Sequence, residues 1–277
     1  MLIDSETQNA FRENGVAKLS GFFDAEMLAA LRSCFDWTLL NPGPNAAPIV
    51  FPDGSRQHTD NHNIEGMPLY VEAVSQQPIA KMLRELWDSE HVWLLGEEVF
   101  YKEGNVPMTL WHQDTAYHPW GGEQWVNLWI PFCDVPHTHS LEVVRGSHRG
   151  TRYDGTAFDP ADPTLPLWGE AGDFPRLPDI EQERLANPGS WDIISFDMRL
   201  GDALVLHPGA LHGGARVDES FSCRRTLVLR LHGDDAFWLD LPEDTSRLSE
   251  AMRNVVNVGE RGEPGSPMRD PRSVQLC

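Results

Sequence analysis

The sequence predicts a mainly β protein, a double-sheet jelly roll with helices before it. From residue 91 onward, short runs rich in Val, Leu, Trp and Phe recur between Gly, Pro or Asp, as strands do between turns. Before residue 91, apolar residues instead recur at helical spacing. The 277 residues are expected to form a single domain, with a helical flank and entrance loop at 1–90, a jelly-roll core at 91–235 and a tail at 236–277.

The N-terminal residues are predicted to form two helices around one strand. Ser5 begins a capping-box pattern that starts a short helix, and Gly15 stops that helix. Residues 15–22 are typical of a strand. Asp24 can cap the second helix, whose apolar residues keep helical spacing until Asn41-Pro42 ends it.

Residues 42–75 are rich in Pro, Asn, His and Asp, which predicts a long loop. Ser75 can then cap a third helix, because the apolar residues between Ile79 and Trp87 share one face. The loop holds His58-Thr59-Asp60, the first of three His-x-Asp triplets in the chain. A polar loop supports two metal ligands poorly, so His58 and Asp60 are expected at most to line a substrate entrance.

Seven segments are predicted as strands of the jelly roll: 91–101, 107–115, 124–134, 141–144, 193–198, 202–207 and 223–231. Residues 150–191 carry many Pro, Gly and Asp and little periodicity. Loops of that length inside a domain are usually functional, so we expect a lid over one mouth of the roll. Residues 260–267 lack large apolar side chains and are expected to lie extended on the surface.

Composition limits the partners. A formal charge of −20 argues against nucleic acid or an anionic membrane as the main partner. The four cysteines are far apart and form no C-x-x-C pair, so neither a thiolate zinc site nor a disulfide framework is expected. No signal segment and no apolar stretch of membrane length is evident, which predicts a soluble cytoplasmic protein. The oligomeric state is not determined.

The second triplet, His112-Gln113-Asp114, lies in a predicted strand. Side chains two residues apart in a strand point to the same face, so His112 and Asp114 can bind one metal together. A second imidazole from another strand would complete a face of two histidines and one carboxylate, which leaves open positions on an iron. The segment 201–214 offers His207 and His212, and we prefer His212 because the two glycines after it allow close backbone approach.

The last predicted strand carries a candidate anion clamp. Alternation places Arg224 and Thr226 on one face, together with Val228 and Arg230, whereas Arg225 shares the other face with three leucines. A guanidinium and a hydroxyl two residues apart suit a carboxylate. Parity favours Arg224 over Arg225 as the anchor.

On these residues the chain resembles the phytanoyl-CoA dioxygenase family of iron(II) and 2-oxoglutarate-dependent oxygenases. The resemblance covers roughly residues 8–240. It rests on the order and spacing of Trp111-His112-Gln113-Asp114, Leu128-Trp129-Ile130-Pro131, the segment 141–149, Gly201-Asp202-Ala203-Leu204, Leu211-His212-Gly213 and Arg224-Arg225-Thr226-Leu227.

The resemblance implies a double-stranded β-helix with iron(II) on His112, Asp114 and His212. It also implies 2-oxoglutarate anchored by Arg224, with Trp129 nearby, and O2 as the oxidant that yields succinate and CO2. Two departures matter. The spacing from His212 to Arg224 is one residue longer than usual, which keeps Arg225 open as the anchor. His137 and His139 stand where relatives have an Asn-Gly turn, and their role is left open.

The implied reaction is oxidation, by hydroxylation or otherwise, of an unactivated C–H bond in a small-molecule or acyl substrate. Related halogenases have a small residue in place of Asp114, so a carboxylate here indicates hydroxylation or a similar oxidation. Candidates for the substrate pocket flank the ligands or follow the last strand: Trp111, Gln113, Tyr117, His118, Trp120 and Trp238.

Two other functions fit the same residues. A non-catalytic jelly-roll protein would bind iron and 2-oxoglutarate without consuming oxygen. A cupin-like isomerase or hydrolase would use another divalent metal without 2-oxoglutarate, and Arg224 and Thr226 would then lack the purpose proposed for them. The third triplet, His232-Gly233-Asp234, follows the anchor strand instead of preceding it, which disfavours it as the metal site.

Overall fold

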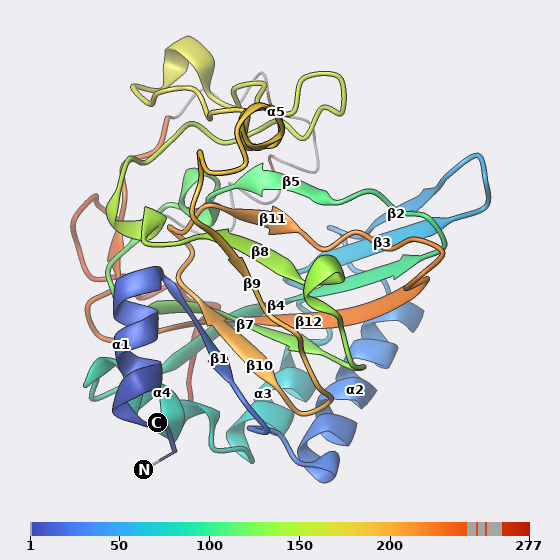
Figure 1. The fold of residues 1–277 in the computed structure, drawn as a ribbon. Coiled ribbons are helices and arrows are strands. Elements are labelled where there is room, and N and C mark those ends of the chain that lie inside the picture. The colour runs from blue at the N-terminus through green and yellow to red at the C-terminus, as the bar shows by residue number, and fades with distance from the viewer. Residues whose placement is uncertain (1, 243–247, 249–252, 254–261) are drawn as a thin grey trace.

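The computed structural model describes residues 2–242, 248, 253 and 262–277, and it is built on two antiparallel sheets (Figure 1). The larger sheet has the order β1-β10-β7-β12-β4-β3-β2, and β14 also pairs with β4. The smaller sheet has the order β5-β11-β8-β9, and β6 pairs with β13. The predicted jelly roll is confirmed, and each of the seven predicted strands has a counterpart.

In the larger sheet and its extension the strands are β1 Val16–Leu19, β2 Ala47–Val50, β3 Arg56–Asn61, β4 Trp93–Glu103, β7 Trp125–Pro131, β10 Ala203–Leu206, β12 Cys223–His232 and β14 Val274–Gln275. The remaining strands are β5 Thr109–His112, β6 Trp120–Gly121, β8 Leu141–Val144, β9 Ile193–Ser195, β11 His212–Gly214 and β13 Phe237–Trp238. The helices are α1 Ser5–Asn14, α2 Ala25–Leu40, α3 Met67–Ser75, α4 Ile79–Trp87 and α5 Ile180–Ala186.

The first two helices begin at capping aspartates. The side chain of Asp24 accepts a hydrogen bond from the Met27 N–H at 2.9 Å, as predicted for α2. At α1 the predicted cap was wrong by one residue, because Asp4 accepts from the Thr7 N–H and Ser5 is already helical. Gly15 ends α1 with a φ of 77°, a left-handed conformation that glycine adopts without strain.

The predicted loop at 42–75 was wrong. It contains the β2–β3 hairpin and all of α3, and Ser75 ends α3 instead of capping α4. The polar segment forms a strand because β4 offers it a free edge, and residues 56–61 pair with residues 98–103. This partner is distant in sequence, so local composition could not reveal it.

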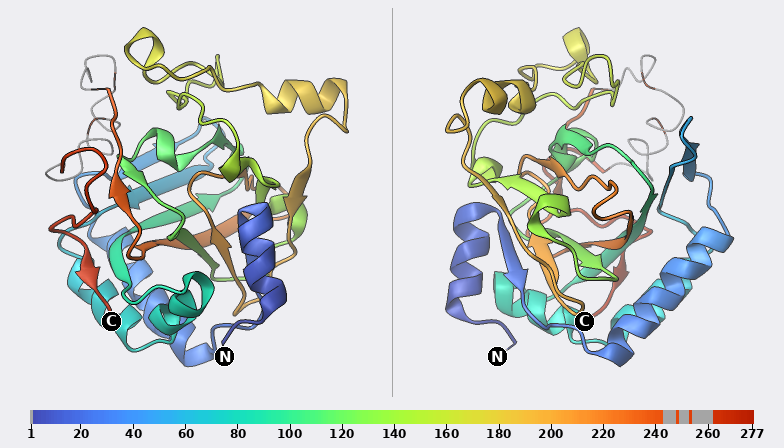
Figure 2. Two further views of the ribbon diagram at one scale, coloured as in Figure 1. Left: turned by 90° about the vertical axis from the view of Figure 1, so that its left-hand side faces the viewer. Right: turned by 45° about the vertical axis from the view of Figure 1, so that its right-hand side comes forward.

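The two faces of the larger sheet have different roles. The outward face packs against α2, α3 and α4 (Figure 2), and it carries Leu227, Leu229 and Leu231 in the main core cluster. On the inward face, Trp129 and Val228 pack with residues of the smaller sheet. The alternation predicted for β12 is confirmed, so Arg224, Thr226 and Arg230 project between the sheets.

Residues 150–191 lie at the end of the molecule opposite the termini, beside the smaller sheet (Figures 1 and 2). Trp168 is buried, and its indole N–H donates to the Ala116 carbonyl at 2.9 Å. The ring of Phe158 lies 5.4 Å from that of His112. This segment therefore covers the region around the second His-x-Asp triplet.

The chain returns to the larger sheet at its C-terminus. Residues 260 and 261 of the predicted surface segment lie outside the described residues, and residues 262–267 are mostly exposed. Met268 is then fully buried, and β14 pairs with the start of β4. Among the described residues, no helix is both long and apolar enough to span a membrane.

Candidate metal centre

Strands β5 and β11 bring three buried side chains together between the sheets. His112 lies directly opposite His212 in the strand register, and Asp114 follows the end of β5. His112 Nε2 lies 3.4 Å and His212 Nε2 4.0 Å from Asp114 Oδ1. One ligand atom from each residue lies within 4.8 Å of the other two, and the described part of the chain offers no other such group. Two imidazoles and one carboxylate at this spacing can hold one metal ion and leave positions open.

Both imidazoles are oriented by their own strands. Nδ1 of His112 lies 2.7 Å from the Leu110 carbonyl oxygen, and Nδ1 of His212 lies 2.9 Å from that of Ala210. A carbonyl only accepts, so each Nδ1 carries the proton and each Nε2 keeps a free lone pair toward Asp114. Burial and the neighbouring His112 lower the pKa of His212 to about 4, which keeps its imidazole neutral.

Asp114 is held as a carboxylate. Its backbone N–H donates to the Pro208 carbonyl at 2.8 Å, and the amide of Asn127 donates to its Oδ2. Burial alone would raise the pKa of Asp114, but the proximity of His112 and His212 outweighs it and holds the pKa well below its ordinary value. A charged carboxylate beside two imidazoles is suited to a divalent cation.

The competing histidine of this segment is turned elsewhere. His207 Nδ1 accepts from the Gly209 N–H at 3.0 Å, and its Nε2 lies 3.3 Å from the Gly122 carbonyl oxygen. Both ring nitrogens are therefore occupied by backbone, and the structure favours His212 as the second imidazole.

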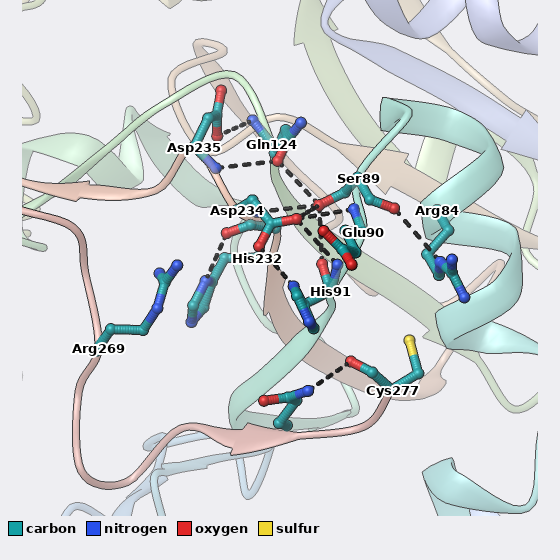
Figure 3. A network of polar contacts seen from close by, with 12 residues as sticks. Arg84, Ser89, Glu90, His91, Gln124, His232, Asp234, Asp235, Arg269 and Cys277 are labelled. Carbon is teal, nitrogen blue, oxygen red and sulfur yellow. Dashed lines mark hydrogen bonds and ion pairs between the residues drawn. The ribbon is translucent and has the colours of Figure 1, made fainter.

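The third His-x-Asp triplet has a structural role (Figure 3). Asp234 Oδ2 accepts from the backbone N–H of Glu90 at 2.8 Å and that of His91 at 3.0 Å, and from the hydroxyl of Ser89. Its Oδ1 lies 3.0 Å from His91 Nδ1. The carboxylate thus fixes the turn between α4 and β4 and has no lone pair directed at a metal.

The first triplet lies on β3 at a distance from the metal group. Asp60 is fully buried and accepts from the Gly43 N–H at 2.7 Å and from the Asn63 amide. It helps to fix the chain between α2 and α3. Burial lowers the pKa of His58, and its Nε2 has no hydrogen-bond partner among the described residues.

One end of β12 holds a cationic pair. Arg224 is 2% exposed, and its Nη1 donates to the carbonyls of Ala215 at 2.7 Å and His139 at 3.3 Å. Lys102 lies opposite Arg224 in the register, and its Nζ donates to the Pro107 carbonyl at 2.8 Å. Within the described chain neither cation pairs with a carboxylate, and Arg224 Nε and Thr226 Oγ1 have no hydrogen-bond partner. This end can therefore accept an anion.

Burial and the neighbouring Arg224 lower the pKa of Lys102 to about 6, and burial lowers that of Arg224 to about 10. Arg225, the alternative anchor, is on the outward face with its guanidinium 5.3 Å from the centre of the Tyr101 ring. Sequence reasoning missed Lys102, because a lysine in a strand gives no local signal of burial.

The other end of β12 holds Arg230, whose Nη2 lies 2.5 Å from Glu98 Oε2. A narrow cavity beside Asp114 is lined by Arg230, Asn127, His118 and Trp120, together with Thr115, Trp125 and Pro208. Alternation predicted that Arg230 points inward, but its neighbours Glu98 and Asn127 could not be predicted from local sequence.

The predicted substrate residues fall into two sets. Tyr117 lies 6.0 Å from His112 between ring centres, and its hydroxyl donates to the Thr156 carbonyl at 2.9 Å. His118 and Trp120 line the cavity beside Asp114 and stack at 4.3 Å. Trp238 packs behind Trp120 in a separate buried cluster. Tyr117, His118 and Trp120 therefore lie beside the metal group, and Trp238 supports Trp120.

Trp111 and Gln113 point away from it. The Trp111 indole N–H donates to Glu181 of α5 at 2.6 Å. The Gln113 amide donates to the Gly209 carbonyl at 2.8 Å, and its oxygen accepts from the Tyr153 N–H. Both residues attach the covering segment 150–191 to the roll, so their positions do not favour substrate contact. Trp129 is buried on the inward face opposite Val228, between the two ends of β12.

Known proteins resemble this chain in sequence and in fold. The sequence profile described as Phytanoyl-CoA dioxygenase (PhyH) matches residues 11–225. A relative from Stutzerimonas stutzeri, described as a probable alpha-ketoglutarate-dependent hypophosphite dioxygenase, is 23% identical over 251 residues, which is 84% of this chain and 80% of the relative.

Two solved structures illustrate the similarity of fold. The epimerase SnoN in complex with Fe3+, alpha ketoglutarate and nogalamycin RO has a TM-score of 0.68 at 17% identity, with 98% of each chain covered. EvdO2 from Micromonospora carbonacea var. aurantiaca, complexed with 2-oxoglutarate, has a TM-score of 0.59 at 18% identity, with 89% of this chain and 97% of that chain covered.

Proposed function

This chain belongs to the phytanoyl-CoA dioxygenase family and is a 2-oxoglutarate-dependent non-haem iron oxygenase, and from that premise we propose that it hydroxylates an unactivated C–H bond of a small molecule. Iron is held by His112, Asp114 and His212. Arg224 anchors the far carboxylate of 2-oxoglutarate. When bound, iron and 2-oxoglutarate supply the oxidation of a C–H bond by O2, with release of succinate and CO2.

The observation that carries the proposal is that the metal group on the smaller sheet and the buried side chains of Arg224, Thr226 and Lys102 on the larger sheet lie between the same two sheets. The Arg224 guanidinium keeps Nε without a partner, and Thr226 directs an unpartnered hydroxyl to the same interior. Buried polar atoms of this kind normally have partners. A dicarboxylate reaching from the metal would supply them, and a cupin-like metal hydrolase would have no use for them.

The protein's own contribution is orientation. Backbone carbonyls fix both imidazoles, and Asn127 fixes the Asp114 carboxylate, so the ligands need little reorganisation when the metal binds. Tyr117, His118 and Trp120 surround the metal group and exclude water from the reacting carbon. Trp129 forms the wall beside the cosubstrate.

Asp114 favours hydroxylation over halogenation, because its carboxylate occupies the position that a halide would need. The neighbour SnoN is described as an epimerase, so the reaction outcome differs among proteins of this fold. Labelled oxygen decides the outcome here: a hydroxylase transfers one atom from O2 to its product, and an epimerase transfers none.

The assignment of the metal ligands is tested by His112→Ala. We expect loss of stoichiometric iron and of succinate formation, because one of three ligands is gone. His207→Ala is the matched control from the neighbouring segment and should retain both. If His112→Ala protein binds one iron and forms succinate at the parent rate, the ligand assignment is wrong. Oxygen uptake in the parent protein separates an enzyme from a non-catalytic binding protein.

A further inference from the structure

The second cationic group on the inward face, Arg230, uses only part of its hydrogen-bonding capacity. Its side chain is buried, and its Nη2 pairs with Glu98. Its Nε and Nη1 have no partner among the described residues. Leaving a buried donor unpaired is unfavourable, and more so for a charged group, so two such atoms on one guanidinium indicate an absent acceptor.

Three neighbouring side chains share this property. His118 Nδ1, His62 Nε2 and Trp120 Nε1 are buried and have no partner in the described structure. His118 and Trp120 line the cavity together with Arg230. The ring of His62 lies 6.4 Å from that of His118 and 6.5 Å from that of Trp120.

Gly96 makes the approach of His62 possible. It pairs with Arg230 across the β4–β12 ladder, and a methyl group there would come within 2.3 Å of His62 Nδ1. The glycine therefore places an imidazole next to the guanidinium on the inward face. Unpartnered nitrogens from β12, the β3–α3 connection and the segment after β5 converge on one place beside Asp114.

The unpartnered nitrogens of this group can act mainly as hydrogen-bond donors. Indole N–H and guanidinium N–H groups only donate, and each neutral imidazole can present one N–H. Two nearby carboxylates already have partners, because Asp114 belongs to the metal group and Glu98 pairs with Arg230. An incoming oxygen acceptor with negative charge satisfies the donors and is attracted by the guanidinium.

We propose that this cavity binds an oxyanion group of the substrate, such as a carboxylate, and thereby holds the neighbouring carbon at the metal. The proposal rests on the proposed function for the identity of the reaction, but not for the binding of the anion. The free space at Asp114 is about 10 Å³, which is room for about one water-sized atom, so the cavity takes a single oxygen of the oxyanion group.

His62 also lines a second cavity of about 400 Å³, together with Arg272 and mainly apolar side chains that include Met67, Val71 and Leu95. The proposed substrate class is a small organic anion. The same oxyanion chemistry could be supplied by the metal-chelating end of 2-oxoglutarate, but that end would leave the donors of His62 and Trp120 unused.

The test is calorimetric titration without oxygen, using butanoate, hexanoate and benzoate against their uncharged amides. Protein loaded with Mn(II) and 2-oxoglutarate is titrated, and metal-free protein is titrated in parallel. We expect at least one acid to bind about 10-fold or more tightly than its amide, because a charged acceptor gains more from a buried guanidinium. If no acid binds better than its amide, the proposal is wrong.

Variants locate the binding. In Glu98→Gln protein Arg230 loses its internal counter-ion, so the acid should bind more tightly than in the parent and should raise the melting temperature. The double variant Glu98→Gln, Arg230→Met removes both charges together, which avoids a lone buried charge, and should lose the preference for acid over amide. Arg225→Met, on the outward face of the same strand, is the matched control and should keep it.

Titration of 2-oxoglutarate into the same proteins shows whether the anion at Arg230 belongs to the substrate or to 2-oxoglutarate. If the double variant weakens 2-oxoglutarate binding and leaves acid binding unchanged, the donors serve the cosubstrate and the proposal is overturned. Acid binding that depends on Arg230 in a protein without succinate formation would uphold the anion site and refute the proposed function. If the protein forms succinate but binds no acid more tightly than its amide, the proposed function is upheld and the anion site is refuted.

Discussion

The two ends of the inward face of β12 each carry a buried arginine, and the structure partners them differently. Arg224 donates only to backbone carbonyls and lies opposite the buried amine of Lys102. Arg230 pairs with the carboxylate of Glu98 and lies among neutral donors. An arginine that pairs with no carboxylate indicates a site for a ligand with a high negative charge. An arginine whose charge is already partly neutralised by a carboxylate indicates a site for a ligand with less negative charge. We therefore assign the diacid cosubstrate to the first end and the substrate to the second.

The largest expected effect is at the Arg224 end. Arg224→Met should weaken 2-oxoglutarate binding by about 100-fold or more, because truncating one partner of a buried charge pair costs about 2–5 kcal/mol. Titration of the Mn(II)-loaded protein measures it. Equal or greater weakening in Arg225→Met protein would transfer the anchor to the outward face.

Lys102 should make the same site sensitive to pH. Its pKa of about 6 leaves the amine mostly neutral at pH 7.5, and a bound carboxylate raises that pKa. Binding of 2-oxoglutarate should then take up about one proton and should tighten as pH falls from 8 to 6. Calorimetry in buffers of different ionisation enthalpy counts the protons. Lys102→Met should abolish the uptake and weaken binding by about 10-fold, and uptake that persists in this variant would contradict the assignment.

Thr226 should affect ligand binding and folding in opposite directions. Its hydroxyl is buried without a partner in the described structure, so Thr226→Val should raise the free energy of unfolding by about 1 kcal/mol. The same change should weaken 2-oxoglutarate binding by about 5-fold, because one hydrogen bond to the carboxylate is lost. Denaturant unfolding and ligand titration measure the two effects, and a loss of stability would show that the hydroxyl serves the fold.

The smallest effect is expected on the outward face. Arg225→Met removes a guanidinium from the Tyr101 ring and should cost about 0.5–1 kcal/mol of stability. Affinity for 2-oxoglutarate should stay within about 2-fold of the parent. Urea unfolding and titration check both, and together they confine the anchoring role to the inward face.

Local periodicity predicted much of this arrangement. The alternation of β12 gave the inward position of Arg224, Thr226 and Arg230, because side chains of a strand point to opposite faces in turn. The spacing of His112 and Asp114 placed both on one face in the same way. Two-residue spacing is a property of the backbone itself, so no distant contact was needed to establish it.

Pairing with distant strands could not be predicted in this way. The segment 42–75 folds as a hairpin and a helix because β4 offers an edge to β3. Lys102 and Glu98 became site residues only because β4 lies beside β12, with residue 102 opposite residue 224 and residue 98 opposite residue 228. A lysine or a glutamate in a strand gives no sign of its burial until its partner strand is known.

The sequence by itself predicted the family, placed His112 and Asp114 on one face of a strand and identified the inward face of the last long strand. Only the tertiary structure showed that His212 lies opposite this triplet, and that His207 and the carboxylates of the other two triplets have partners of their own. The reason is that a ligand set is a property of converging strands. The second and third triplets have the same His-x-Asp pattern but different surroundings. His112 of the second triplet faces His212 across a ladder, and Asp234 of the third accepts hydrogen bonds from the backbone N–H groups of a turn.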